Sequence, residues 1–497
     1  MKRPNLLFIY TDEQRYDTLA CYDNKAIDMP NLNRLAETST VFDQAYVTQP
    51  VCTPSRASLL TGLTPHTCRM TTNNLMLPED VKCLPEYLPD DYVCAHHGKW
   101  HLGDEIFRQH GFDEWMATED SYHAFYRADR DQAERSPYHD FLRSQGVEYA
   151  LPENIPELVR KRFFRDQVAR LPEEMSRPAY LGNTACRFLR DRAGDGQPFA
   201  LYVNFLEPHM PFYSCRDGQY APGDVTVTPN FLHDLPESAP RRLLQHVAKF
   251  RKGYEIDKPL ETEAQWRALF ARYWGMCSLV DTHAGRILQQ LEASGLADNT
   301  IVVFTSDHGD MMGSHRLLGK GNMFEESSRV PLLMHLPGQT AQRRIKGPAS
   351  QLDLVPTILD AMGLDLPSEL EGCSRLDAVC DGSENLDADV VIEWHGRGTG
   401  RRPENLLQPA ASDEKPAVGA DNPDSENIRT IITPDQWKLN ISSLGDHELY
   451  DLNNDPYEMN NLINDSGRQA LIRDLRDRIQ AWQARTGDEL MDLPDLR

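Results

Sequence analysis

Cys52 carries the strongest chemical signal in the sequence. It opens the run CTPSR at residues 52–56, in which Thr53 suits a helix N-cap, Pro54 a first helical residue and Gly62 a helix end. The N–H groups and dipole at a helix N-terminus favour an anion, so a thiol there should have a lowered pKa. This cysteine either belongs to an active site or is the incidental thiol of a capped helix.

Acidic, basic and imidazole side chains follow four apolar segments elsewhere in the chain. Residues 5–11, 92–95, 199–205 and 301–305 are apolar runs typical of buried parallel strands. The polar residues after these runs include Asp12 and Glu13, Lys99 and His101, His209, and Asp307 and His308. Ligands bind outside the carboxyl ends of strands in open parallel sheets. If the four strands are neighbours, we expect these side chains to converge on one site.

The elements between these strands predict an α/β architecture. A long amphipathic stretch over 263–292, with Gly295 as its C-cap, predicts a helix that leads into the strand at 301–305. After about residue 376 the pattern changes to short strands at 390–394, 428–432 and 437–441 and a terminal helix over 466–486. We therefore expect a catalytic domain over residues 1–375 and a C-terminal α+β subdomain over 376–497.

Composition limits the class of protein. The chain has 497 residues, 40% hydrophobic and 26% charged, with a formal net charge of −24. This acidic balance argues against an extended nucleic-acid or anionic-membrane surface, and no apolar run approaches the ~20 residues of a membrane span. Ten cysteines without a C-x-x-C pair do not make a disulfide scaffold. Because the N-terminus lacks a secretory apolar segment, we expect a cytoplasmic protein.

The motif at 52–56 resembles the signature of the type I sulfatases of the alkaline phosphatase superfamily, Cys-x-Pro-x-Arg at the start of a helix. The further motifs that carry the resemblance, in the order of the family, are GKWHLG at 98–103, PHMP at 208–211, SDHG at 306–309, GKGNMFEE at 319–326, and ELYDL at 448–452 with DP at 455–456. The resemblance extends from residue 5 to about 462. It implies a mixed, mostly parallel sheet sandwiched by helices, with a smaller C-terminal subdomain containing a short antiparallel sheet.

The resemblance also implies a modified nucleophile and a metal. In the family a separate maturation enzyme oxidises the cysteine to formylglycine, whose hydrated aldehyde attacks sulfur. Here that residue is Cys52, and its oxygen would complete a divalent cation site with Asp12, Glu13, Asp307 and His308. Such oxygen ligands suit Ca²⁺, while the imidazole of His308 also suits Mn²⁺ or Zn²⁺. Many members have Asp where this chain has Glu13.

The remaining catalytic roles follow from the same resemblance. Arg56 would hold the hydrated aldehyde and offset the charge of the metal carboxylates. Lys99 and His101 would reach the nucleophile and the sulfuryl oxygens, with His101 as the base that regenerates the aldehyde. His209 and Lys320 would face the leaving-group oxygen, one of them as general acid or as the charge that neutralises the alkoxide.

These expectations predict a sulfuric ester hydrolase that acts on a small sulfated substrate, with carbohydrate preferred over aryl sulfates. Two alternatives stay open. One is a phosphonate monoester or phosphodiester hydrolase on the same scaffold, and the other is a non-catalytic binder of sulfated glycans with Cys52 unmodified.

Several further residues are weaker candidates for contacts with substrate. His315, eight residues after Asp307, either touches substrate or lies on the surface. The stretch 393–397 either offers an aromatic and cationic platform over the pocket, through Trp394, His395 and Arg397, or is an edge strand with a loop. Three more residues fall in an apparent insertion that could line the pocket: Tyr122, His123 and Arg127.

Overall fold

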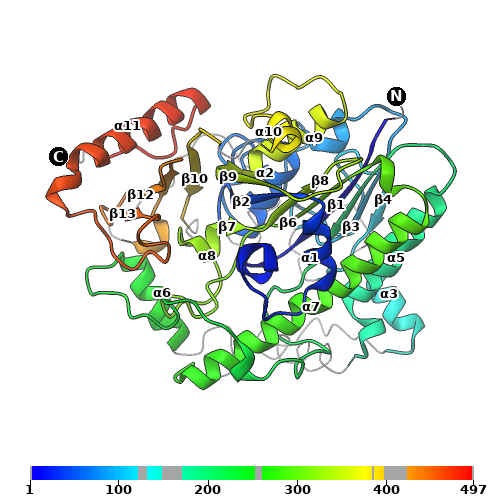
Figure 1. Ribbon diagram of the computed structural model, residues 1–497, viewed down its shortest axis with the longest axis horizontal. Coiled ribbons are helices and arrows are strands. Elements are labelled where there is room, and N and C mark those ends of the chain that lie inside the picture. Colours follow the sequence, from blue (N-terminus) through cyan, green and yellow to red (C-terminus); the bar gives the residue numbers. More distant parts are fainter. Residues whose placement is uncertain are drawn as a thin grey trace.

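A computed structural model describes residues 3–120, 131, 133–147, 171–251, 260–382, 386–396 and 422–494. Its largest element is a nine-stranded sheet (Figure 1). The strands are β1 (Asn5–Thr11), β2 (Thr40–Tyr46), β3 (Val93–Gly98), β4 (Glu114–Met116), β5 (Phe199–Asn204), β6 (Thr300–Ser306), β7 (Arg329–Val330), β8 (Leu332–His335) and β9 (Arg343–Ser350). Their order is β4-β3-β5-β1-β6-β8-β2-β7, with β9 paired to β2.

The four predicted strands are adjacent and parallel in this sheet. β5 and β6 flank β1, and β3 lies beyond β5. The register places Tyr10 opposite both Asn204 and Thr305, and Gly98 opposite Asn204. The carboxyl ends of these strands are therefore level, which confirms the predicted convergence of the segments that follow them. β8 runs antiparallel to β6 and β2, so the sheet is mixed.

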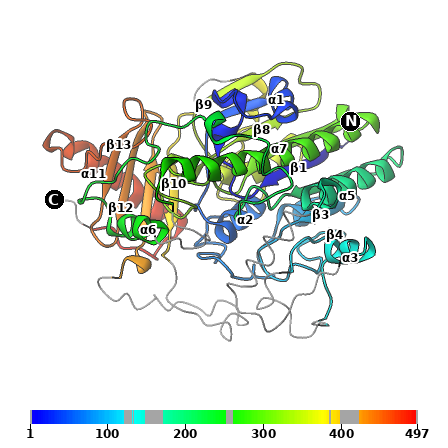
Figure 2. The same cartoon turned by 90° about the horizontal axis from the view of Figure 1, so that it is seen from below.

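Helices cover both faces of this sheet. The helices that the structure describes before residue 390 are α1 (Pro30–Glu37), α2 (Cys52–Thr61), α3 (Pro137–Ser144), α5 (Arg177–Arg192), α6 (Arg241–Arg251), α7 (Glu263–Ala293), α8 (Glu325–Ser328), α9 (Leu354–Ala361) and α10 (Leu376–Asp381). Leu7 and Ile9 of β1 pack into a core formed with α1, α5 and α7, whereas Phe8 and Tyr10 point to the core of α2 and α9. Figures 1 and 2 show α5 and α7 side by side on their face.

A separate four-stranded antiparallel sheet follows in the order β10 (Val390–Trp394), β11 (Ile428–Ile432), β12 (Trp437–Ser442) and β13 (Glu448–Asp451). Helix α11 (Gln469–Thr486), preceded by a 3-10 turn at Ser466–Arg468, packs against one face of it. The predicted fold class is confirmed, including the small sheet, although β13 was expected only as a motif.

The expected boundary near residue 375 stays a prediction. Ala378 and Val379 of α10 lie in the core of the large sheet.

Among the described helices, none combines the length and apolar character that crossing a membrane requires.

Candidate active site

Helix α2 presents Cys52 as its first residue. The N-cap is Val51, so the expectation that Thr53 caps the helix is wrong; the Thr53 hydroxyl instead donates to the carbonyl of His101 at 2.9 Å. Gly62 ends the helix with φ +71°, as predicted. Every residue of α2 is buried, including Cys52 at its start.

Burial overturns the expected acidity of the Cys52 thiol. A helix N-terminus alone would stabilise a thiolate. Here desolvation, followed by the negative charge of Asp12, raises the pKa of Cys52 well above its ordinary value. The cysteine side chain is therefore a neutral thiol next to a carboxylate.

Cys52 belongs to a group of four potential metal ligands. Asp12 follows β1, and Asp307 and His308 follow β6; one donor atom from each of these residues and Cys52 lies within 4.8 Å of the others. The Cys52 sulfur is 3.2 Å from His308 Nε2 and 3.7 Å from Asp12 Oδ1. All four side chains are buried. Two carboxylates and an imidazole are a donor set that divalent cations accept, so these residues fit a metal.

Two buried cations hold the carboxylates of this cluster. Arg56 donates to Asp12 Oδ2 and to Asp307 Oδ2, each at 2.8 Å, and Lys99 Nζ lies 2.6 Å from Asp12 Oδ2. Burial alone would raise the pKa of Asp12, but Lys99 and the other nearby cations hold it well below its ordinary value. Burial and then the Asp12 charge raise the pKa of Asp307. The other oxygen of each carboxylate, Asp12 Oδ1 and Asp307 Oδ1, lies 3.8 and 3.6 Å from His308 Nε2.

Glu13 is not one of these four residues, and its carboxylate has other partners. Its Oε1 accepts a hydrogen bond from Lys320 and lies 3.3 Å from His209 Nε2. With φ +68°, its backbone is in the left-handed region, where its N–H donates to Asp307 and its carbonyl accepts from the Tyr273 hydroxyl at 2.7 Å. Such a conformation at a non-glycine residue costs of order 1–3 kcal/mol and is typical of functional sites.

His209 and Lys320, predicted to face the leaving group, thus meet at the carboxylate of Glu13. Desolvation is the main cause that lowers the pKa of His209 to about 4. His209 is therefore a neutral imidazole near pH 7. Asp12, Glu13 and His209 also form a second group of potential ligands within 4.8 Å, so the ligand role of Glu13 stays a prediction.

His101 is held by residues that the sequence did not single out. Its Nε2 lies 2.8 Å from Asn74 Oδ1, and its backbone, at φ +58°, donates to Glu105 at 2.6 Å. Burial and then the charge of Lys99 lower the pKa of His101 well below its ordinary value. A neutral imidazole can accept a proton, as the predicted base requires. No spacing pattern marks Asn74 or Glu105, because both reach His101 only through the folding of loops.

The structure does not place the weaker candidates on an open surface. His315 is buried, 3.0 Å from the Tyr457 carbonyl and stacked on Phe324, so the expectation of a surface position is wrong. Trp394 is buried under Arg242, and the His395 side chain lies against Glu393 with 5% of its surface exposed, so neither forms an open platform. β10 is an edge strand, as the alternative predicted. The other candidates lie outside the described residues: Tyr122, His123, Arg127 and Arg397.

Comparison with known proteins identifies this arrangement. A family model described as Sulfatase matches residues 4–364. The chain belongs to the sulfatase family. This sulfatase is 29% identical over 472 residues to the uncharacterized sulfatase YidJ of Escherichia coli K12, which covers 94% of the chain and 84% of YidJ. It is 27% identical to the N-acetylglucosamine-6-O-sulfatase of Bacteroides thetaiotaomicron, over 93% of the chain and 83% of that protein.

The solved structure of a phosphonate monoester hydrolase from Agrobacterium radiobacter has the same fold. The two share a TM-score of 0.76 at 23% identity, covering 97% of this chain and 96% of that one. The family match makes this sulfatase a sulfuric ester hydrolase with an alkaline phosphatase superfamily fold.

Proposed function

We propose that this sulfatase removes sulfate from a sulfated carbohydrate, with Cys52 converted to formylglycine and a divalent cation held next to it. The observation that carries the proposal is the position of Cys52 among Asp12, Asp307 and His308, three donors contributed by two neighbouring strand ends. A thiol held neutral by burial is a poor nucleophile. An aldehyde hydrate at the same position offers two hydroxyl groups, one for attack and one for release of the sulfate.

The side chains around residue 52 divide the remaining work. A divalent cation held by Asp12, Asp307, His308 and residue 52 would supply positive charge to the nucleophile and the sulfuryl oxygens; we propose Ca²⁺ first, with Mn²⁺ and Zn²⁺ as alternatives. Arg56 fixes the orientation of both carboxylates through its two hydrogen bonds. Lys99 adds a second positive charge next to Asp12.

Proton transfer and leaving-group stabilisation fall to different side chains near residue 52. His101, a neutral imidazole oriented by Asn74, accepts a proton from a hydroxyl group of the nucleophile at residue 52. Lys320 offsets the negative charge that develops on the leaving oxygen, and its partner Glu13 keeps the ammonium group in place. His209, on the same carboxylate, contributes a hydrogen bond rather than a charge.

The name of one relative supports a carbohydrate substrate, because that relative is a sulfatase of N-acetylglucosamine 6-O-sulfate. The likeness to the phosphonate monoester hydrolase favours the second candidate function, hydrolysis of phosphonate monoesters or phosphodiesters. Tetrahedral sulfate and phosphonate groups have similar shapes, so both fit a site built from the same charges.

Two measurements test the proposal. Mass spectrometry of the peptide that contains residue 52, from protein matured in its native host or with a formylglycine-generating enzyme, should show an aldehyde in place of the thiol. The matured protein should then hydrolyse members of a panel of sulfated sugars, with an aryl sulfate and an aryl phosphonate of the same phenol as references. Cys52→Ala is the matched inactive control. A higher kcat/KM on the phosphonate would reverse the order of the two functions, and a modified protein inactive on every ester would refute both.

A further inference from the structure

The loop that carries Lys320 is tied down on both sides. Gly319 and Gly321, on either side of Lys320, have φ +74° and +85°, a region that glycine adopts readily. The Gly321 N–H donates to the carbonyl of Pro50 at 3.0 Å, two residues before Cys52. The Gly321 carbonyl accepts a hydrogen bond from the guanidinium group of Arg242. The peptide next to Lys320 is thus fixed between the loop of the nucleophile and helix α6.

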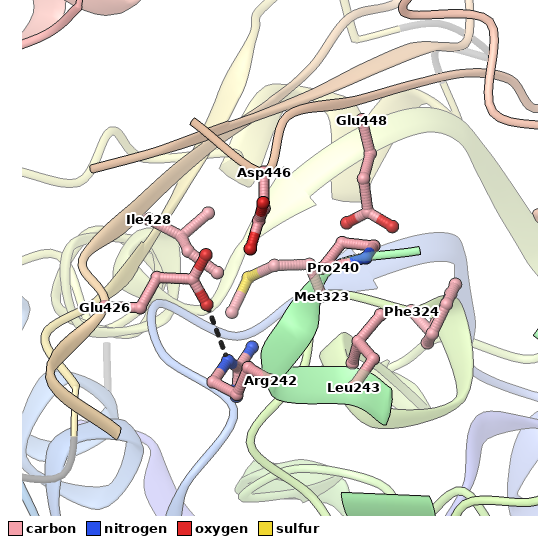
Figure 3. Close-up of a pocket in the computed structure, with 9 residues that line it drawn as sticks. All are labelled: Pro240, Arg242, Leu243, Met323, Phe324, Glu426, Ile428, Asp446 and Glu448. Carbon is pink, nitrogen blue, oxygen red and sulfur yellow. Dashed lines mark hydrogen bonds and ion pairs between the residues drawn. The ribbon is translucent and has the colours of Figure 1, made fainter. Parts of the chain in front are cut away.

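Arg242 is itself held by the C-terminal sheet. Its Nε donates to Glu426 Oε2 at 3.0 Å, at the edge of a small pocket between α6 and that sheet (Figure 3). Its guanidinium carbon lies 4.8 Å from the ring centroid of Trp394, the last residue of β10. The second Glu426 oxygen accepts from the Ser442 hydroxyl. A planar guanidinium that is both paired and stacked has one orientation, so Arg242 is a rigid donor.

Trp394 contacts the loop as well as Arg242. A Cβ atom added to Gly321 would lie 2.9 Å from Trp394 Cη2, which means that the indole packs directly against the backbone of Gly321. Arg242, Trp394 and Glu426 are all buried, with exposed fractions of 3%, 4% and 1%. We call these three residues the Arg242 clamp.

We propose that the Arg242 clamp positions Lys320, so that the C-terminal sheet sets the leaving-group side of the active site. This inference rests on the proposed function, in which Lys320 stabilises the leaving oxygen. None of the three residues is a catalytic residue, because each acts on the reaction only through the loop. A displacement of about 1 Å in a catalytic group can cost about 100-fold in rate, so a loosened loop should be costly.

The clamp predicts an effect that depends on the leaving group. A nitrophenolate needs little charge stabilisation when it departs, whereas a sugar alkoxide needs a great deal. Loss of the clamp should therefore lower kcat/KM on a sulfated sugar by about 10- to 100-fold and on a nitrophenyl sulfate by less than about threefold. An equal loss on both substrates would show a general structural role and would overturn the proposal.

Two variants make this test independent of folding defects. Arg242→Gln combined with Glu426→Gln removes both charges together, so that no buried charge is left unpaired. Trp394→Leu removes the indole ring that Arg242 stacks on and leaves the ion pair between Arg242 and Glu426 intact. If the double variant does not fold, this single variant tests the clamp. Arg241→Gln is the matched control, because Arg241 is the preceding residue of α6 and pairs with Asp446 at 2.9 Å, on the side of the small sheet. Its ratio of sugar to aryl activity should equal that of the wild type.

A double-mutant cycle with Lys320→Ala makes the test specific. If the clamp acts through Lys320, Trp394→Leu should leave the sugar-to-aryl ratio unchanged in the Lys320→Ala background. Additive changes in that ratio would overturn the proposal. If the wild type hydrolyses phosphonates alone, the proposed function fails but the clamp can still be tested. The ratio is then measured with phosphonate esters of the same sugar and nitrophenol. The clamp predicts the same larger loss on the sugar ester.

Discussion

Glu13 has different charged partners from Asp12 and Asp307 at the residue scale. Asp12 and Asp307 pair with Arg56, whereas Glu13 pairs with His209 and Lys320. The backbone of Glu13 is in the left-handed region where its side chain makes these contacts. Neighbouring acidic residues in the sequence therefore have different surroundings, and this difference predicts different effects on metal binding.

We expect Glu13→Gln to keep the bound metal and Asp307→Asn to lose it. Both changes replace a carboxylate by an amide of the same shape, and only Asp307 belongs to the group of four donors around Cys52. The content of metal per protein, measured by elemental analysis after dialysis, should stay near the wild-type value in Glu13→Gln. The kcat/KM of this variant on a sulfated sugar should fall by about tenfold, because the ion pair between Lys320 and Glu13 is lost. Equal loss of metal in both variants would instead make Glu13 a ligand.

At the scale of elements, a buried ion pair joins the turn after α2 to β10 and α11. His66 Nδ1 lies 2.8 Å from Glu393 Oε1, and its Nε2 lies 3.1 Å from the Thr486 carbonyl. Burial alone would lower the pKa of His66, but the hydrogen bond and charge of Glu393 outweigh it and raise this pKa to about 9. Helix α2, which begins at Cys52, is therefore linked to the small sheet through the imidazole of His66, a group that gains or loses a proton with pH.

This pair predicts a stability that decreases with rising pH. Because the folded pKa of His66 lies above its ordinary value of 6.5, the stabilisation is complete below about pH 6.5 and is lost as pH rises through about 9. The free energy of unfolding of the wild type, relative to His66→Gln, should fall by about 3 kcal/mol across this range. Urea denaturation at several pH values measures it. Glu393→Gln should flatten the same profile, and a difference that is constant with pH would contradict the assignment.

At the scale of the whole molecule, one lysine of the small sheet connects it to the large one. Lys438 Nζ, on β12, lies 3.0 Å from Glu325 Oε1 of α8 and 2.8 Å from Glu458 Oε1. The Tyr46 hydroxyl of β2 donates to the other oxygen of Glu325 at 3.0 Å. All four side chains are buried, so the contact between the sheets contains fully desolvated charges.

Lys438→Met should lower the free energy of unfolding by about 3–5 kcal/mol, because it removes the cation that lies 2.8 Å from Glu458 and leaves Glu325 paired with Arg329 at 3.6 Å. Lys25→Met, at an exposed position, is the control and should change it by less than about 0.5 kcal/mol. Urea unfolding of both variants measures the difference. A loss below about 1 kcal/mol for Lys438→Met would show that the two carboxylates are already neutralised without the lysine.

Local patterns were sufficient to predict most elements and the main site residues. Apolar runs of strand length marked β1, β3, β5 and β6, because strands buried on both faces need continuous apolar sequence. The motif at 52–56 marked the start of α2 to within two residues, because capping preferences are local. The charged residues after the strands were also visible, since the carboxyl ends of parallel strands share one edge of a sheet.

Only the tertiary structure decided how these residues pair. The sequence predicts a common site for Glu13, Lys320 and His209, but nothing in their spacing indicates that the other two pair with the Glu13 carboxylate, because each reaches it through a separate loop. Likewise, Trp394 and His395 resemble an exposed platform in the sequence but are buried by α6 and Glu393. The sequence determines which strands form and what chemistry their ends can perform, since these depend on neighbouring residues. Burial, charge pairing and pKa depend on contacts between distant segments, and these exist only once the two sheets are packed together.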